Sequence, residues 1–173
     1  FAGNFLWSSG PNTEAGGDRD VPCHLDIPLR NCSLSLDGEP MTRDGEVVRV
    51  NGAAQTWHSM DTTNYNLNLY HFARAHSKPT SNVLFWVVTT VDSPREMQNV
   101  RLAIGSNAAS RWWLNGEPVI ALNDDRQSVI DDGVSKRSTL RKGRNVIRAA
   151  IINGGGATDF CARFLDENNK PVV

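Results

Sequence analysis

Short apolar runs separated by tight-turn dipeptides dominate the chain, and no long segment repeats its apolar residues with the period of a helix. Asx-Gly pairs interrupt the runs, and such pairs supply the positive φ angles that hairpin turns need. They are Asp37-Gly38, Asp44-Gly45, Asn51-Gly52, Asn115-Gly116, Asp132-Gly133 and Asn153-Gly154. This pattern predicts an antiparallel, all-β chain.

The second half of the chain contains the clearest strands. Val83–Val91 is rich in Val, Thr, Phe and Trp, which favours a central strand covered on both faces. Further strands are predicted at Val100–Ile104, Trp112–Leu114, Val119–Leu122, Asn145–Ile152 and Phe160–Phe164, with weaker ones at Phe5–Trp7, Glu46–Val50, Gln55–His58 and Leu67–Tyr70. The polar stretch Tyr70–Thr80 is predicted to be an exposed loop. We expect a single domain over residues 1–173, an antiparallel β-sandwich of jelly-roll type with about nine strands.

Charge and length exclude several function classes. Lys plus Arg number 18 and Asp plus Glu number 19, so the 173-residue chain has a formal net charge of −1. It therefore lacks the basic field that nucleic acid or an anionic membrane would attract. The longest apolar stretch, Val83–Val88, is far too short to cross a bilayer.

The ends and the cysteines bear on the compartment. The chain begins at Phe1 without an initiator Met, so we expect a piece of a larger multidomain protein whose secretion signal lies elsewhere. Cys23 and Cys32 are nine positions apart and could form a disulfide. The alternative is that these two and Cys161 are all reduced thiols.

A series of short motifs follows in a fixed order along the chain. They are Phe5–Pro11, Trp57 followed by Tyr65–Leu69, Val87–Val91 with Ser93-Pro94, Val100–Ser106, Trp113–Val119, Leu140–Ile147, Asn153–Gly156 and Asp159–Phe164. The ordered set resembles the accessory, carbohydrate-binding-module-like jelly-roll domains of secreted polysaccharide-degrading enzymes. Leu140–Ile147 is also similar to a turn and strand in the sugar-binding domain of family 2 glycoside hydrolases. The segment Gly105–Ala109 departs from the family, which often has two acidic residues there.

This resemblance implies a non-catalytic, secreted carbohydrate-binding module. Its partners would be a plant cell-wall polysaccharide or oligosaccharide and the catalytic domain of the same polypeptide, an esterase, glycosidase or lyase. Two rival interpretations are a structural β-sandwich that packs on a catalytic domain without binding sugar, and a minimal glycan hydrolase. No Gly-x-Ser-x-Gly, His-Glu-x-x-His or P-loop motif is present, so no catalytic residue is predicted and the module is expected not to be an enzyme.

Sugars stack on flat aromatic faces, while carboxylates, amides and Arg bond their hydroxyls. Neighbouring strand residues face opposite ways, so Trp112 and Trp113 cannot both enter one core, and we predict that Trp112 faces the ligand. Trp57 and Tyr65 form a second candidate patch. The predicted polar contacts are Asn107, Asp124, Asp125, Arg126, Asp131 and Asp132.

The acidic loop that contains Asp124–Asp132 also has the composition of a calcium site, or of a solvated turn. Asp166, Glu167 and Asn168 form a second candidate calcium loop near the C-terminus. We expect no required cofactor, with structural calcium as the one candidate metal.

Overall fold

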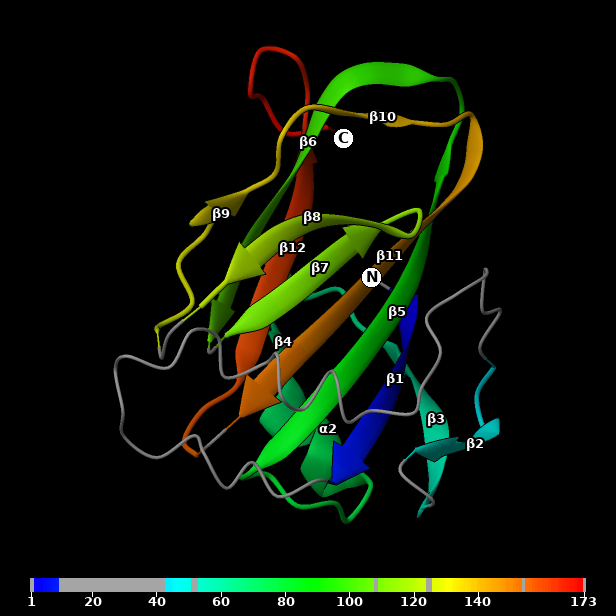
Figure 1. The fold of residues 1–173 in the computed structure, drawn as a ribbon, viewed down its shortest axis with the longest axis vertical. Helices are drawn as coiled ribbons and strands as arrows, with labels where there is room; N and C mark the ends of the chain where they lie inside the picture. The colour runs from blue at the N-terminus through cyan, green and yellow to red at the C-terminus, as the bar shows by residue number, and fades with distance from the viewer. Residues whose placement is uncertain are drawn as a thin grey trace.

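Two antiparallel β-sheets make up most of the molecule (Figure 1). The computed structural model describes the backbone of residues 2–9 and then residues 43–50, 53–107, 109–123, 126–153 and 155–172. In spatial order, the seven-stranded sheet consists of β2 (Val47–Val50), β3 (Ala53–Asp61), β1 (Ala2–Ser9), β5 (Val83–Ser93), β11 (Gly143–Asn153), β7 (Ser110–Leu114) and β8 (Glu117–Leu122). The five-stranded sheet consists of β10 (Ser138–Leu140), β6 (Met97–Asn107), β12 (Asp159–Leu165) and β4 (Leu67–Asn68), with β9 (Gly133–Val134) paired to β6.

The predicted antiparallel β-sandwich is confirmed, although it has more strands than the nine expected. The extra strands are short, because β4 and β9 have only two residues each and are too brief to leave a periodic pattern. Among the described residues, no helix has the length and apolarity needed to span a membrane.

Strand alternation explains two apolar clusters. In β5 the odd-numbered residues of 83–87 enter the main core, which lies between the two sheets. The even-numbered residues of 84–88 enter a second cluster on the opposite face of the seven-stranded sheet. Trp86 belongs to that second cluster and Phe85 to the main core. The prediction that Val83–Val91 is covered on both faces is therefore confirmed over 83–89, where every residue is buried.

One helix, α2 (Leu69–Ala75), lies where a strand and a loop were predicted. The side chain of Asn68 caps it, because its Oδ1 accepts a hydrogen bond of 2.9 Å from the backbone N–H of His71. Leu69, Phe72 and Ala73 form its buried face. These positions follow the helical i, i+3, i+4 spacing, but two turns are too short for that spacing to stand out in the sequence.

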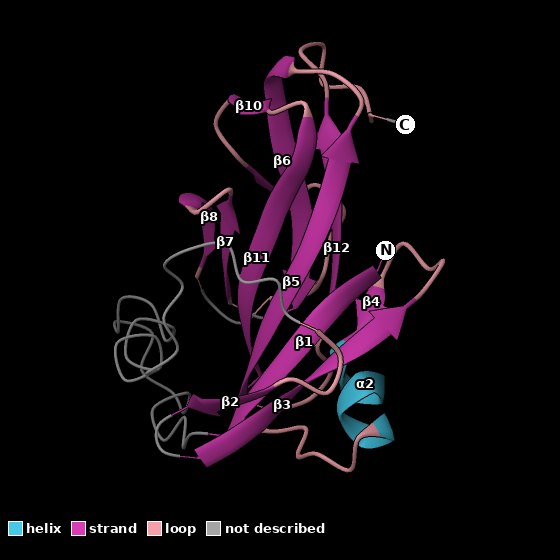
Figure 2. Cartoon of the chain, turned by 90° about the vertical axis from the view of Figure 1, so that its right-hand side faces the viewer, coloured by secondary structure: helices cyan, strands magenta, loops and turns pink. Residues whose placement is uncertain are grey.

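Strand β1 lies between β3 and β5, near the middle of the larger sheet (Figure 2). Phe5 is in register with His58 on one side and with Val87 on the other. The first residues of the chain are therefore part of the sandwich rather than an appendage to it.

Candidate functional site

A trough of about 410 Å³ lies against strands β6 and β12 of the five-stranded sheet. In β12, Phe160 and Phe164 enter the main core, so Cys161 and Arg163 face the opposite way. Their partners on β6 are Gly105 for Cys161 and Ala103 for Arg163. The small side chain of Ala103 leaves room for the trough, whereas the space over Gly105 is taken by the backbone of Val129.

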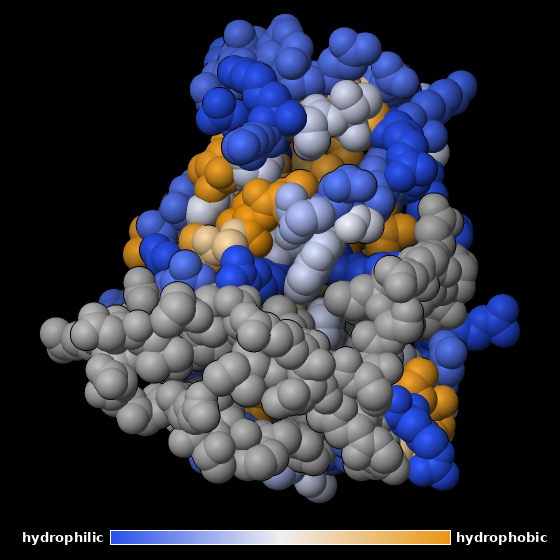
Figure 3. Space-filling view, in the orientation of Figure 1, coloured by the Kyte–Doolittle hydropathy of each residue, from blue (hydrophilic) through white to orange (hydrophobic). Residues whose placement is uncertain are grey.

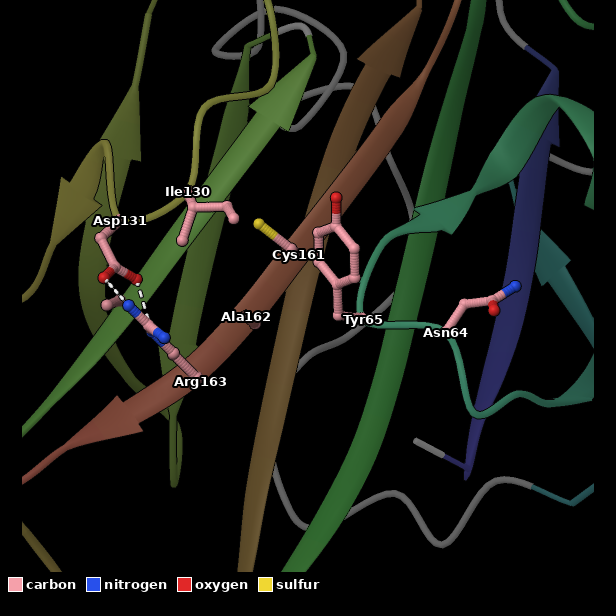
Figure 4. A pocket seen from close by; sticks show the side chains of 8 residues that line it. Asn64, Tyr65, Ile130, Asp131, Cys161, Ala162 and Arg163 are labelled. Atoms are coloured by element: carbon pink, nitrogen blue, oxygen red, sulfur yellow. Dashed lines mark hydrogen bonds and ion pairs between the residues drawn. The ribbon is translucent and has the colours of Figure 1, made fainter. Parts of the chain in front are cut away.

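Two large apolar side chains stand on either side of the trough (Figure 4). Tyr65, from the segment between β3 and β4, is 74% exposed. Ile130, from the segment between β8 and β9, is 53% exposed. Apolar atoms also reach the surface in the region of β8 and β9 (Figure 3). The trough is therefore an apolar slot between Tyr65 and Ile130, and Asn64 also lines it.

An ion pair lies at the edge of this slot. Arg163 Nε donates a hydrogen bond of 2.9 Å to Asp131 Oδ1, and an Arg163 amino group donates to Oδ2 of the same carboxylate. The contact is bidentate, the strongest geometry for this pair. The hydrogen bond to Asp131 is the main reason that the pKa of Arg163 is raised above its usual value. The Arg163 guanidinium therefore stays charged, and its charge is paired with the Asp131 carboxylate.

The backbone holds the Asp131 wall against the sheet. A Cβ added to Gly105 would lie 2.1 Å from the carbonyl oxygen of Val129, so only glycine allows this approach. Asp131 itself has a left-handed φ of 60°. The backbone N–H of Asp132 donates to the carbonyl of Val129, which closes the turn.

Cys161 forms part of the floor and is a free, buried thiol. Burial is the largest cause of its raised pKa, so the thiol stays protonated at neutral pH. A protonated thiol is a weak nucleophile, and we assign this one to packing. The predicted alternatives for Cys23 and Cys32 lie outside the described residues.

The prediction that Trp112 faces a ligand is wrong. Trp112 is 1% exposed and packs edge-on against Phe160 in the main core. Trp113 faces the other way and lies near Trp86, with ring centroids 6.0 Å apart. Trp112 and Trp113 do face opposite sides of the sheet, as predicted. The assignment of the two sides was reversed, because Trp112 lies on the same side as Leu114, which faces the main core. Trp57 is also buried, at 3% exposure, and cannot stack on a ligand.

The other predicted residues separate into two places. Tyr65 and Asp131 line the trough. Asn107 and Arg126 border a different, more open hollow of about 360 Å³, and Arg126 forms an ion pair with Asp132. Asp124 and Asp125 lie outside the described residues. The trough residues that the prediction missed are Asn64, Ala103, Ile130, Cys161, Ala162 and Arg163.

The candidate calcium loop near the C-terminus is a tight turn. Asp166 Oδ1 accepts hydrogen bonds of 2.8 Å from the backbone N–H groups of Asn168 and Lys170. The carbonyl of Glu167 accepts from Arg137. No group of three or more His, Cys, Asp or Glu side chains in the described part of the chain could hold a metal ion. Structural calcium at Asp166, Glu167 and Asn168 stays a prediction.

The N-terminal residues resemble a known enzyme. The family model of 2,5-dihydroxypyridine 5,6-dioxygenase matches residues 1–49. The 2,5-dihydroxypyridine 5,6-dioxygenase of Pseudomonas putida KT2440 is 62% identical over 48 residues, which are 28% of this chain and 14% of that protein. The chain therefore spans about one seventh of this relative. The matched segment includes β1, which lies inside the larger sheet.

Solved structures resemble the sandwich. An anti-sigma factor domain-containing protein has a TM-score of 0.52 and 9% identity, over 66% of this chain and 39% of that one. A PA14 sugar-binding domain from an RTX adhesin has a TM-score of 0.45 and 12% identity, over 55% and 52%. A family 35 carbohydrate-binding module from Clostridium thermocellum has a TM-score of 0.34 and 16% identity, over 60% and 89%.

These comparisons correct the predicted function. The match to a dioxygenase points to an enzyme, so the predictions of a non-catalytic carbohydrate-binding module and of a chain that is not an enzyme are wrong. The predicted resemblance is confirmed for the β-sandwich. Two of the similar structures are a sugar-binding domain and a carbohydrate-binding module. Secretion stays a prediction.

Proposed function

We propose that this chain is part of an enzyme that acts on a small hydroxylated aromatic ring, and that the trough binds such a ring. The observation that carries the proposal is the 62% identity to 2,5-dihydroxypyridine 5,6-dioxygenase over 48 residues. That relative acts on a six-membered aromatic ring with two hydroxyl groups. Within the matched segment, strand β1 belongs to the same sandwich as the trough, since it pairs with β3 and β5.

The trough has the size and lining for a ligand of this kind. Its volume of about 410 Å³ is ample for a single six-membered ring and lies in the usual range of small-molecule pockets. A flat ring can stack on the exposed face of Tyr65 while its other face contacts Ile130. Ring hydroxyls can donate to the lone pairs of Asp131 that Arg163 leaves unused.

A sugar ring is the second candidate ligand, because its C–H face can also stack on Tyr65. A sugar, however, carries hydroxyls around its whole edge and needs several polar partners. In the trough, Asp131 and Arg163 already bond to each other, and Ala103, Ile130 and Ala162 offer only apolar contact. This lining favours an aromatic ring over a cell-wall saccharide.

The role of the described residues is to bind and orient the ring. Non-haem iron oxygenases hold Fe(II) with two histidines and a carboxylate. The described residues contain no group of three or more potential ligands, so they do not fit such a site and we assign no metal-dependent step to them.

Binding tests this proposal directly. The purified protein is titrated with 2,5-dihydroxypyridine and, separately, with xylose and xylan, and binding is followed by NMR line shifts. We expect saturable binding of the pyridine in the high micromolar to millimolar range, as one small ring can supply. Tyr65→Ala should weaken this binding at least about tenfold, while Val47→Ala, at an exposed position outside the trough, should leave it unchanged.

The outcomes separate the two ligands. Binding of xylose or xylan alone, lost in Tyr65→Ala, would overturn the aromatic proposal in favour of a sugar. Binding of the pyridine that Tyr65→Ala leaves intact would show that the trough is not the site. Consumption of 2,5-dihydroxypyridine under air, followed by its ultraviolet absorbance, tests the enzymatic part, and Tyr65→Ala is expected to raise KM more than it lowers kcat.

A further inference from the structure

We propose that Asp131 determines which rings the trough accepts, because it occupies the carboxylate-binding edge of Arg163 and so excludes ligands that carry a carboxylate. The inference rests on the proposed binding of a ring in the trough. It adds that the ligand must not carry a negative charge, and it names the residue that enforces this.

An arginine beside an apolar slot is ordinarily a carboxylate receptor. Its planar guanidinium presents parallel N–H groups that match the two oxygens of a carboxylate. Arg163 has this location, since its side chain is 44% exposed at the edge of the trough. Without Asp131, the guanidinium would be available to an acidic group on a ring stacked against Tyr65.

Asp131 already makes the contact that such a ligand would make. Its two carboxylate oxygens accept from Arg163 Nε and from an Arg163 amino group (Figure 4). A ligand carboxylate must therefore displace the Asp131 carboxylate. The effective concentration of Asp131 is high, because the chain holds it next to Arg163. The pair also leaves no net positive charge to attract an anion.

Contacts other than the one to Arg163 hold the backbone at Asp131. The turn that carries it is closed by the Asp132 N–H to Val129 carbonyl bond, and Val129 packs on the backbone of Gly105. Asp132 is tied in addition to Arg126. The Asp131 carboxylate should therefore stay at the rim when Arg163 is replaced.

A second acid strengthens the exclusion. Asp159 follows the same outward alternation of β12 as Cys161 and Arg163, and its carboxylate accepts a hydrogen bond of 2.7 Å from Asn66. Asp159 lies two residues before Cys161 and Arg163 two residues after it on the same face of β12, so the charges of Asp159 and of the Asp131–Arg163 pair lie beside Cys161. Their sum is negative, and this disfavours an anionic ring further.

A matched pair of probes tests the inference. Hydroquinone and 2,5-dihydroxybenzoate share a ring and two hydroxyls and differ by one carboxylate. Both are titrated anaerobically into the wild-type protein and into Asp131→Asn, which tolerates the left-handed backbone and removes the negative charge. We expect the wild type to bind hydroquinone and to bind 2,5-dihydroxybenzoate several-fold more weakly.

In Asp131→Asn we expect the affinity for 2,5-dihydroxybenzoate to rise roughly tenfold, as a new charge-assisted contact would give. Hydroquinone affinity should change little, and added salt should weaken only the binding of the acid. Arg163→Gln and the double variant Arg163→Gln/Asp131→Asn are the controls, and neither should gain affinity for the acid. Thermal unfolding of each variant verifies that it is folded.

The results test the role of Asp131 separately from ring binding by the trough. If the wild type and Asp131→Asn had the same ratio of affinities for hydroquinone and 2,5-dihydroxybenzoate, the proposed role of Asp131 would be overturned, while ring binding would stand. A wild type that prefers the acid would overturn it as well. Failure of the wild type to bind either probe would overturn the proposed ring binding itself.

Discussion

The imidazole rings of His58 and His76 stack on each other, with centroids 3.8 Å apart and planes 18° from parallel. His58 belongs to β3, and His76 is the C-cap of α2. Phe72 contacts both rings, at centroid distances of 6.2 Å and 4.8 Å. The stack therefore joins the helix to the larger sheet on a part of the molecule that the ligand proposals do not involve.

This stack predicts that the protein loses stability in mild acid. Burial is the first cause that lowers the pKa of His58 below 6.5, and the charge of His76 is the second. The folded state then binds fewer protons than the unfolded state between the lowered pKa and 6.5, so the stabilisation is present above about pH 6.5 and is lost as the pH falls below it.

Denaturant unfolding at several pH values between about 7 and 5 measures the effect. We expect His58→Phe, which keeps an aromatic ring and cannot titrate, to flatten the dependence over this range. His71→Gln, at an exposed position of the same helix, should leave it unchanged. A wild-type stability that does not change over this interval would contradict the prediction.

A buried amide is expected to be a major source of stability. Asn145 is completely buried, and its Oδ1 accepts from Asn115 Nδ2 and from the Arg141 N–H, each at 2.9 Å. Its Nδ2 donates to the carbonyls of Arg141 and Gly143, at 2.8 and 3.0 Å. Asn145→Ala should lower the free energy of unfolding by about 2–4 kcal/mol, because several buried groups lose partners together. Asn123→Ala, at an exposed site, should cost less than about 0.5 kcal/mol in the same denaturation assay.

Gly105 is expected to couple stability to binding. In Gly105→Ala the new methyl group would overlap the Val129 carbonyl, so the segment that carries Ile130 and Asp131 must move. We expect a loss of about 1–3 kcal/mol in unfolding free energy and weaker binding of hydroquinone. Gly155→Ala meets no atom within 4 Å and is the control. Wild-type affinity and stability in Gly105→Ala would show that the wall is not held this way.

The motifs that suggested the fold act mainly as structural devices. Asn115, in the hairpin after Trp113, bonds to Asn145, near the start of β11, and the Asn115 Oδ1 also accepts from the Val146 N–H at 2.9 Å. These motifs predict a β-sandwich because they hold hairpins and strands in register. They carry no information about the ligand, which is why the resemblance predicted the fold correctly and the function wrongly.

The trough could be predicted only in part, because four distant segments of the chain form it. Tyr65 and Asp131 were singled out by their residue types, but their common location depends on the pairing of β6 with β12. Arg163 had a usable signal, since it alternates with Phe160 and Phe164 and so faces away from the core. The same alternation also indicates that Trp112 is buried, because Trp112 shares a strand face with Leu114.

Strand β1 provides the last prediction, because it combines the dioxygenase-like sequence with the sandwich. It pairs with β3 on one side and with β5 on the other, so its backbone groups bridge the larger sheet. Leu6→Pro removes one N–H from the middle of this strand, where proline is not tolerated. We expect a large loss of stability, about 3 kcal/mol or more, with insoluble expression as an extreme result.

Leu6→Val, which keeps the N–H and favours a strand, is the matched control and should remain soluble and close to the wild type in thermal unfolding. If β1 were dispensable, Leu6→Pro and Leu6→Val would unfold at the same temperature. A difference between them would mean that the dioxygenase-like residues are needed to complete the sheet. The trough on the other sheet should then fail in Leu6→Pro together with the fold, so loss of hydroquinone binding and loss of the cooperative transition should occur in the same variant.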